Sequence, residues 1–181
     1  MHFSYEKIYT MNELKQYVEA HDIRFEPQFV AVEGLVFDAQ QNWILMRRGP
    51  GCRDEQLKLE GIGGRVDNET DLKAALFREL HEEAGMDAVI SVVEPFEIRT
   101  DTVFDSRLNR TITWIIVSFI CVYKSGEMQI CEPTKNLGYE LFSIDGIPFD
   151  ELSSSAKSAF IELQKNWDNV SSVIARGYGH D

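Results

Sequence analysis

Apolar and polar residues follow a helical spacing in three segments of the chain. The first segment, TMNELKQYVEAHD, carries a capping-box pair, Thr10 and Glu13, ahead of its apolar positions. We expect it to form a short helix at the periphery of the fold. A second helix is predicted over residues 71–84 with Thr70 as its N-cap, and a closing helix over about residues 148–167.

Other segments have the alternating or β-branched character of strands. Residues 29–37 and 43–47 flank a polar turn and predict one hairpin, and residues 88–104 and 111–123 predict a second. Short extended pieces are predicted at residues 57–60, 127–131 and 139–144. The order of helices and strands indicates an α/β (α+β) fold in which helices cover both faces of a mixed sheet.

Composition and charge narrow the class of protein. The 181 residues are 44% hydrophobic and 27% charged, which predicts one globular domain over residues 1–181, with residues 1–25 as an N-terminal extension. A net charge of −12 argues against nucleic acid or an anionic membrane as partner. Three cysteines without a CxxC pair, and an N-terminus without the apolar core of a signal peptide, predict a reduced, cytoplasmic protein.

The segment RELHEEAG, residues 78–85, crowds three glutamates onto one short helix. Projected down the helix axis, Glu79 and Glu83 fall within the apolar stripe that should face the core, and Glu82 falls at its edge. A solvated helix face is the alternative. Carboxylates on the core side are costly to desolvate unless a cation compensates them, and Arg78 projects closer to Glu82 than to the other two. This favours a divalent cation that prefers oxygen ligands, Mg²⁺ or Mn²⁺.

These residues, with the glycines before them, resemble the signature of the Nudix hydrolase family. The family's box, placed at residues 64–86, has nine fixed positions, and this chain supplies eight of them. The eight are Gly64, Arg78, Glu79, Leu80, Glu82, Glu83, Gly85 and Met86. The resemblance implies the Nudix fold, an α/β/α sandwich with a mixed sheet, in a MutT-like member of the superfamily.

The resemblance also implies roles for the acidic helix. Glu79, Glu82 and Glu83 would bind the divalent cation, and the backbone carbonyl of Gly63 would add a ligand. Glu79, or a carboxylate outside the box, would act as base toward the attacking water. Arg78 would orient Glu79 or its neighbours through charge-assisted hydrogen bonds.

One position departs from the box. Residue 70 should be a glutamate that helps to orient Arg78, and this chain has Thr70 there with Glu69 just before it. Either Glu69 takes over that role after a shift of one residue, or Thr70 simply caps the helix. Gly64 and Gly85 are structural candidates, and Gly85 stands where a helix is usually closed by a left-handed residue.

Two further groups bear on the substrate. The segment 131–148 resembles a stretch of mutator-type members that act on nucleoside triphosphates, which makes Glu132 a candidate for an extra ligand or base; the alternative is a polar turn. Five basic residues near the start of the box are candidates for holding phosphates, or else they balance acidic neighbours. They are Arg47, Arg48, Arg53, Lys58 and Arg65.

We therefore expect a Mg²⁺-dependent pyrophosphohydrolase that cleaves a nucleoside diphosphate linked to another group. The favoured substrate is a nucleoside triphosphate, intact or damaged, which would give the monophosphate and pyrophosphate. An ADP-ribose or nucleotide-sugar pyrophosphatase on the same metal site stays open, as does a non-catalytic nucleotide-binding regulator. The partner is a small nucleotide-type diphosphate, and the oligomeric state, including a homodimer, stays open.

Overall fold

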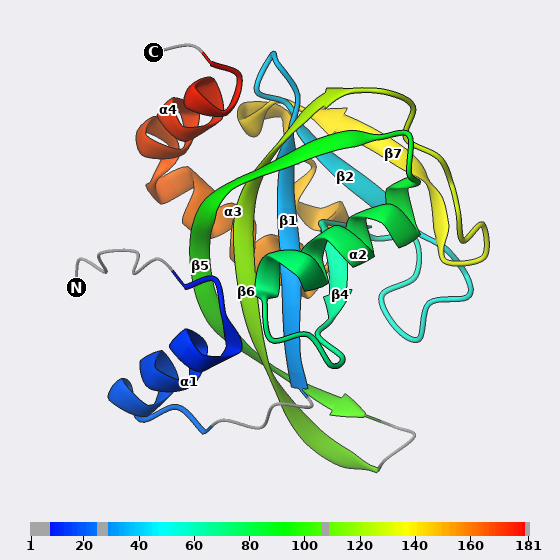
Figure 1. Ribbon diagram of the computed structural model, residues 1–181. Coiled ribbons are helices and arrows are strands. Elements are labelled where there is room, and N and C mark those ends of the chain that lie inside the picture. The colour runs from blue at the N-terminus through cyan, green and yellow to red at the C-terminus, as the bar shows by residue number, and fades with distance from the viewer. Residues whose placement is uncertain (1–7, 25–28, 106–108, 180–181) are drawn as a thin grey trace.

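A mixed sheet forms the centre of the computed structural model, which describes residues 8–24, 29–105 and 109–179, without the side chains of residues 103–105. In this part of the chain the sheet has seven strands, and its main path runs β3-β2-β1-β6-β5 (Figure 1). The strands are β1 Val30–Phe37, β2 Trp43–Arg48, β3 Leu59–Glu60, β4 Ile62–Arg65, β5 Val89–Asp105, β6 Arg110–Ser125 and β7 Asn136–Phe142. The helices are α1 Met11–Ala20, α2 Leu72–Ala84, α3 Ser154–Lys165 and α4 Trp167–Gly177, with short 3-10 turns η2 Ile144–Gly146 and η3 Phe149–Glu151.

Strand β1 connects the parts of the sheet that matter for the site. It runs parallel to β6 and antiparallel to β2 and β4. The β1–β4 pairing places Glu33 opposite Gly63, and the β1–β6 pairing places it opposite Ser118. β1 therefore joins the glycine-rich strand before α2 to the long β5–β6 pair.

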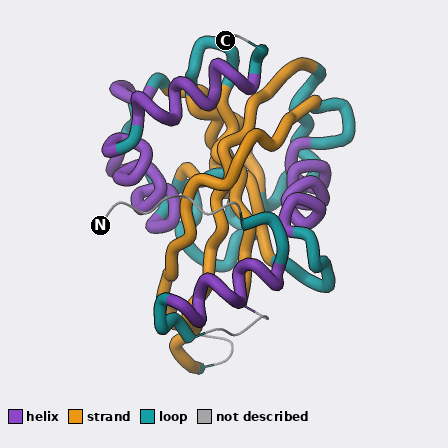
Figure 2. The backbone as a smooth tube through the Cα atoms, turned by 60° about the vertical axis from the view of Figure 1, so that its left-hand side comes forward, coloured by secondary structure: helices purple, strands orange, loops and turns teal. Residues whose placement is uncertain are grey.

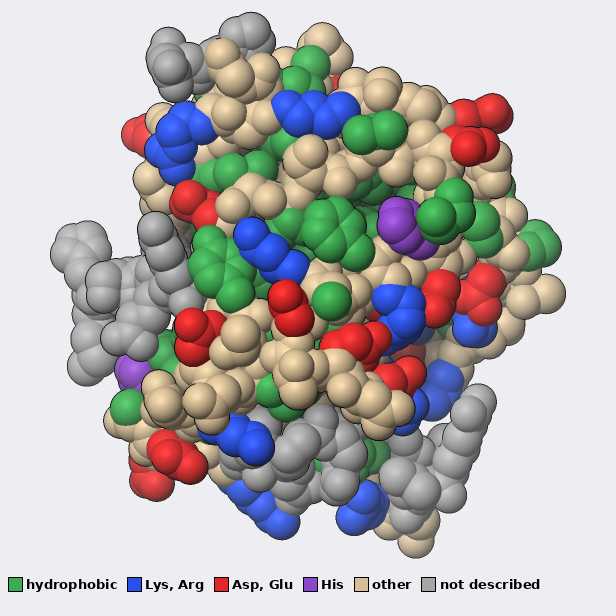
Figure 3. All heavy atoms as spheres, viewed as in Figure 1, with side chains coloured by type: hydrophobic (Ala, Val, Ile, Leu, Met, Phe, Trp, Pro, Cys, Tyr) green, Lys and Arg blue, Asp and Glu red, His purple; other side chains and the backbone are tan. Residues whose placement is uncertain are grey.

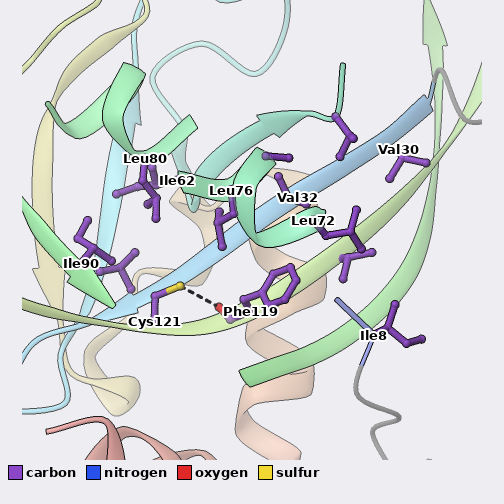
Figure 4. Packing of buried hydrophobic residues seen from close by; sticks show 14 of the residues in the cluster. Ile8, Val30, Val32, Ile62, Leu72, Leu76, Leu80, Ile90, Phe119 and Cys121 are labelled. Atoms are coloured by element: carbon purple, nitrogen blue, oxygen red, sulfur yellow. Dashed lines mark hydrogen bonds between the residues drawn. The ribbon is translucent and has the colours of Figure 1, made fainter. Parts of the chain in front are cut away.

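Helices cover both faces of the sheet (Figure 2). On one face, Leu72, Leu76 and Leu80 of α2 pack toward β1 and β6 (Figure 4). On the other face, α3 and α4 bury residues such as Phe160 and Ile174 against the sheet. This arrangement confirms the α/β/α sandwich. Within the described ranges, no helix is both long enough and apolar enough to cross a membrane.

The N-terminal helix α1 is not peripheral. Its predicted capping box is confirmed, and its apolar side chains Leu14 and Val18 are fully buried in the same core cluster as α2. Backbone bonds also tie the two helices together: the Met11 N–H donates to the carbonyl of Thr70 at 2.9 Å, and the Leu72 N–H donates to that of Tyr9 at 2.8 Å. The helix therefore helps to fix where α2 begins.

Three expectations about elements were wrong. The N-cap of α2 is Asp71 rather than Thr70, because the Asp71 side chain accepts hydrogen bonds from the N–H groups of Lys73 and Ala74. Residues 127–131 form no strand. The closing helix α3 begins later than predicted, at Ser154, and a further helix that was not predicted, α4, follows it; Asn166, whose side chain bonds the carbonyl and carboxylate of Glu162, lies between the two.

The burial of α1 predicts a stability effect. Leu14→Ala should lower the free energy of unfolding by about 2–4 kcal/mol, because it leaves a cavity beside α2. Gln16→Ala, on the exposed side of the same helix, should change it by less than about 0.5 kcal/mol. Urea unfolding followed by circular dichroism measures both, and a Leu14→Ala variant as stable as the control would show that α1 is not part of the core.

Candidate active site

Two carboxylates of α2 end against two glycines of β4. The Gly63 N–H donates to Glu83 Oε2 at 3.0 Å. A Cβ atom at Gly64 would lie 2.4 Å from Glu79 Oε2, so this carboxylate can approach the strand only where the residue has no side chain. The prediction that Glu79 and Glu83 turn inward is confirmed, since both are half-buried while the Glu82 side chain is 56% exposed.

The Glu83 carboxylate carries the strongest electrostatic perturbation in this region. Burial, together with the negative charges of Glu79 and Glu132, raises its pKa to about 8, against the opposing effect of the hydrogen bond from Gly63. Burial also raises the pKa of Glu79, which Arg78 opposes. Ionising both carboxyl groups, Glu79 and Glu83, is therefore unfavourable, because the positive charge beside them does not balance the two negative charges.

Arg78 holds the outer side of this cluster. Its Nε donates to Glu69 at 2.6 Å, its Nη1 to Glu79 at 2.6 Å and its Nη2 to the carbonyl of Arg65 at 2.8 Å. The Arg78 guanidinium lowers the pKa of Glu69. Glu69, one residue before the position where the box has a glutamate, thus forms the ion pair with Arg78. Arg78 is closer to Glu79 than to Glu82, whose carboxylate is 3.3 Å away. On the face that carries α2, acidic and basic side chains lie next to one another beside the helix (Figure 3).

The end of α2 is fixed by two contacts. Gly85 closes the helix with φ 86° and ψ 165°, a backbone conformation that is essentially restricted to glycine. The hydroxyl of Tyr139, from β7, donates to the backbone carbonyl of Glu83 at 2.6 Å. This contact could not be predicted from local sequence, because Tyr139 is 56 residues away from Glu83 in the chain.

The donor set is of the kind that suits a hard divalent cation. Glu79 and Glu83 present carboxylate oxygens beside the Gly63–Gly64 backbone, with Glu82 on the same helix and Glu132 near enough to raise the Glu83 pKa. Among the described residues, no group of three or more His, Cys, Asp or Glu side chains is close enough together to hold a metal ion by itself. A cation held here would complete its shell with water or phosphate oxygens, which is the usual state of Mg²⁺ in proteins.

A cleft of about 450 Å³ opens on the other side of the glycine strand. Three of the five basic candidates, Arg48, Arg53 and Arg65, line it together with Gly63 and Gly64. Each already contacts a carboxylate: Arg48 contacts Glu60 and Asp54, Arg53 contacts Asp54, and Arg65 contacts Asp67.

The other two basic candidates do not line this cleft. Arg47 pairs with Glu140 and Glu151 at 2.7 Å each. Lys58 donates to the carbonyl of Asp150 at 2.7 Å. Arg47 and Lys58 therefore bind protein groups outside the cleft, and the prediction that they hold phosphates is not supported.

Glu132 lies in the loop before β7. Its carboxylate, 42% exposed, pairs with Lys135 at 2.8 Å, and its carbonyl accepts the N–H groups of Lys135 and Asn136. This is the polar turn that the sequence suggested. Its effect on the Glu83 pKa shows that it also lies within electrostatic reach of the box carboxylates.

An ionic network under the cleft was missed. Arg99 of β5 donates to Glu33 at 2.8 Å, to Glu97 at 3.0 Å, to Ser118 and to Ser155. Apart from Glu97, which lies on the same strand, its partners come from β1, β6 and α3. The signal available was a single charged residue in the otherwise apolar run VAVEGLVF of β1, where every neighbour is buried or partly buried.

Comparisons with known proteins agree with this geometry. A family model described as NUDIX domain matches residues 27–163. Comparison with curated proteins gives no match. The structure is similar to the MutT NUDIX hydrolase from Burkholderia pseudomallei, with TM-score 0.58 and 20% identity over 74% of this chain and 96% of that one.

Two other similar structures are proteins with different ligands or substrates. One is a UDP-X diphosphatase, with TM-score 0.61 and 17% identity over 87% of this chain and 71% of that one. The other is the NUDIX domain of Shewanella oneidensis NrtR complexed with ADP ribose, with TM-score 0.56 and 14% identity over 87% of this chain and 99% of that one. At these identities the likeness concerns the fold.

The match of the family model covers most of the chain, and the box residues stand on the helix and strand that build the acidic site. The chain therefore belongs to the NUDIX domain family.

Proposed function

We propose that the protein is a Mg²⁺-dependent pyrophosphohydrolase that converts a nucleoside triphosphate, intact or damaged, to the monophosphate and pyrophosphate. The observation that carries this proposal is the contact of Glu79 and Glu83 with the Gly63–Gly64 strand, directly beside a cleft with arginines at its wall. A diphosphate in the cleft would then meet the acidic cluster across the glycine strand.

In this proposal Glu79, Glu82 and Glu83 hold the cation, with Glu132 and the Gly63 carbonyl as further candidates. When bound, the cation neutralises phosphate charge and lowers the pKa of a coordinated water. Arg78 keeps the Glu79 carboxylate in place, so that Glu79 can accept a proton from the attacking water.

Arg48, Arg53 and Arg65 are the proposed phosphate contacts. All three line the cleft, and each would exchange an exposed or half-buried carboxylate partner for phosphate oxygens. The cleft volume of about 450 Å³ suits one nucleoside with its phosphates, which supports a nucleoside triphosphate over larger dinucleotides.

A substrate panel tests the proposal. Nucleoside triphosphates, ADP-ribose, UDP-sugars and dinucleoside polyphosphates are incubated with enzyme and Mg²⁺, and released pyrophosphate and phosphate are measured. Pyrophosphate release from a nucleoside triphosphate is expected. Turnover of ADP-ribose or a UDP-sugar alone would identify the rival pyrophosphatase activity, and tight binding without turnover of any diphosphate would favour a regulator.

Glu83→Gln should separate stability from activity. The amide keeps the hydrogen bond to Gly63 but removes a poorly compensated charge, so we expect the melting temperature of the metal-free protein to rise at pH 8. Turnover should fall by about 100-fold or more, and the stabilisation by added Mg²⁺ should shrink. Glu127→Gln, which changes an exposed glutamate, is the control. Unchanged turnover in Glu83→Gln would refute the assignment of Glu83 as a metal ligand.

Metal affinity should depend on pH. The Glu83 pKa is raised from 4.5 to about 8, so this group favours the folded protein when protonated, and that contribution is lost as the pH rises through about 8. Mg²⁺ must displace the same proton. Its apparent affinity, measured by calorimetry, should therefore rise by up to about tenfold per pH unit between pH 6 and 8. An affinity that is constant over this range would contradict the shared site.

Variants at Glu69 and Thr70 test which of these two residues replaces the glutamate that the Nudix box has at position 70. Glu69→Gln weakens the 2.6 Å ion pair that orients Arg78, and we expect kcat to fall by about 10-fold or more with little change in KM. Thr70→Ala should leave kcat nearly unchanged, because Thr70 is linked to α1 through its backbone carbonyl. A larger loss in Thr70→Ala than in Glu69→Gln would reverse the assignment.

A further inference from the structure

One carboxylate oxygen of Glu33, in the lining of the cleft, accepts no hydrogen bond from the described residues. Glu33 Oε2 accepts hydrogen bonds from Arg99 Nη2 and from Ser118 Oγ, both at 2.8 Å. Within the described chain, Oε1 of the same carboxylate accepts none, although the side chain is only 7% exposed. In the part of the chain that the structure describes, Oε1 is not among the fully buried atoms that lack a partner, so this oxygen is accessible from the cleft that Glu33 lines, and a molecule there can donate to it.

The strand beside this oxygen leaves room in front of it. Glu33 and Gly61 both line the cleft, and a Cβ atom at Gly61 would lie 2.7 Å from Glu33 Oε1. Any side chain at position 61 would therefore fill the space that the glycine leaves beside the oxygen. The missing donor can come from a molecule in the cleft.

The neighbouring wall groups indicate what kind of molecule this is. Asp101, whose carboxylate lies 3.7 Å from Arg99 Nε, adds a second acceptor to the cleft wall, and Trp114, its partner in the β5–β6 register, adds an aromatic ring. A ligand that suits this wall has a planar ring that can stack on the indole of Trp114. It also carries N–H donors on the edge of that ring, because ionised carboxylates only accept hydrogen bonds. The basic residues of the cleft come instead from the end of β2, the loop after it and β4.

We propose that Glu33 determines specificity by accepting a hydrogen bond from the exocyclic amine of the substrate's nucleobase. The inference rests on the proposed function for the presence of a nucleotide. Bases that present an amine, such as guanine or cytosine, satisfy Oε1. Bases that present a carbonyl there place two acceptors together and leave the oxygen unpaired.

A glutamine at position 33 should reverse this choice. Arg99 and Ser118 both donate to the Oε2 position, so the amide oxygen of Glu33→Gln must lie there. The amide nitrogen then takes the place of Oε1 and presents a donor to the cleft. The variant should prefer a carbonyl-bearing base over an amine-bearing one.

Calorimetric binding of nucleoside monophosphates tests this without metal or turnover. The probes are the matched pairs GMP and IMP, AMP and IMP, and CMP and UMP. For the unmodified protein, we expect the amine-bearing member of at least one pair to bind about tenfold or more tightly. Glu33→Gln should abolish or reverse the preference in that pair. Glu97→Gln, which changes another partner of Arg99 that does not line the cleft, should keep it.

Equal affinity within every pair, or no measurable binding of any monophosphate, would overturn the proposal, and so would an unchanged preference in Glu33→Gln. The comparison of ligands on the unmodified protein decides the matter even if the variant does not fold. A base preference in binding with no hydrolysis of any triphosphate would refute the proposed reaction and leave the role of Glu33 standing. Hydrolysis of a triphosphate without any base preference in binding would refute the role of Glu33 and leave the proposed reaction standing.

Discussion

The contact of the Glu79 and Glu83 carboxylates with the Gly63–Gly64 backbone constrains everything around it. A side chain at Gly64 would collide with Glu79, and the Gly63 N–H is a direct donor to Glu83. The two carboxylates repel each other and are partly desolvated, which is unfavourable for the folded protein alone. Such a cost is tolerated where a bound cation offsets it during function.

The fold holds this contact in place from three sides. The apolar side of α2 packs on β1 and β6, α1 is bonded to the start of the helix, and Tyr139 is bonded to its end. β1 pairs with β4, the strand whose glycines contact the carboxylates of α2. The same strand carries Glu33, which lines the cleft. One strand therefore connects the acidic cluster with the cleft, so the positions of phosphate and base would be set by the same rigid element.

The sequence predicted the parts of the site that depend on local periodicity. The phase of α2 alone predicted that Glu79 and Glu83 face inward with Glu82 at the edge of the apolar stripe, and the shift from residue 70 to Glu69 was one of two open alternatives. It did not predict contacts between distant strands, such as Arg99 with Glu33, because register across a sheet is not encoded locally. Nor could alternation along β2 have separated Arg47 from Arg48, because the register between β2 and β7 shifts between Met46 and Arg48 and interrupts the regular alternation of side chains.

The central claim is that the inward carboxylates form a divalent-cation site. A titration with Mn²⁺, followed by electron paramagnetic resonance of the free aqueous ion, tests it directly. We expect saturable binding that is weakened by about tenfold or more in Glu79→Gln and in Glu83→Gln, and retained in the exposed control Glu127→Gln. Equal Mn²⁺ binding in all four proteins would contradict the account.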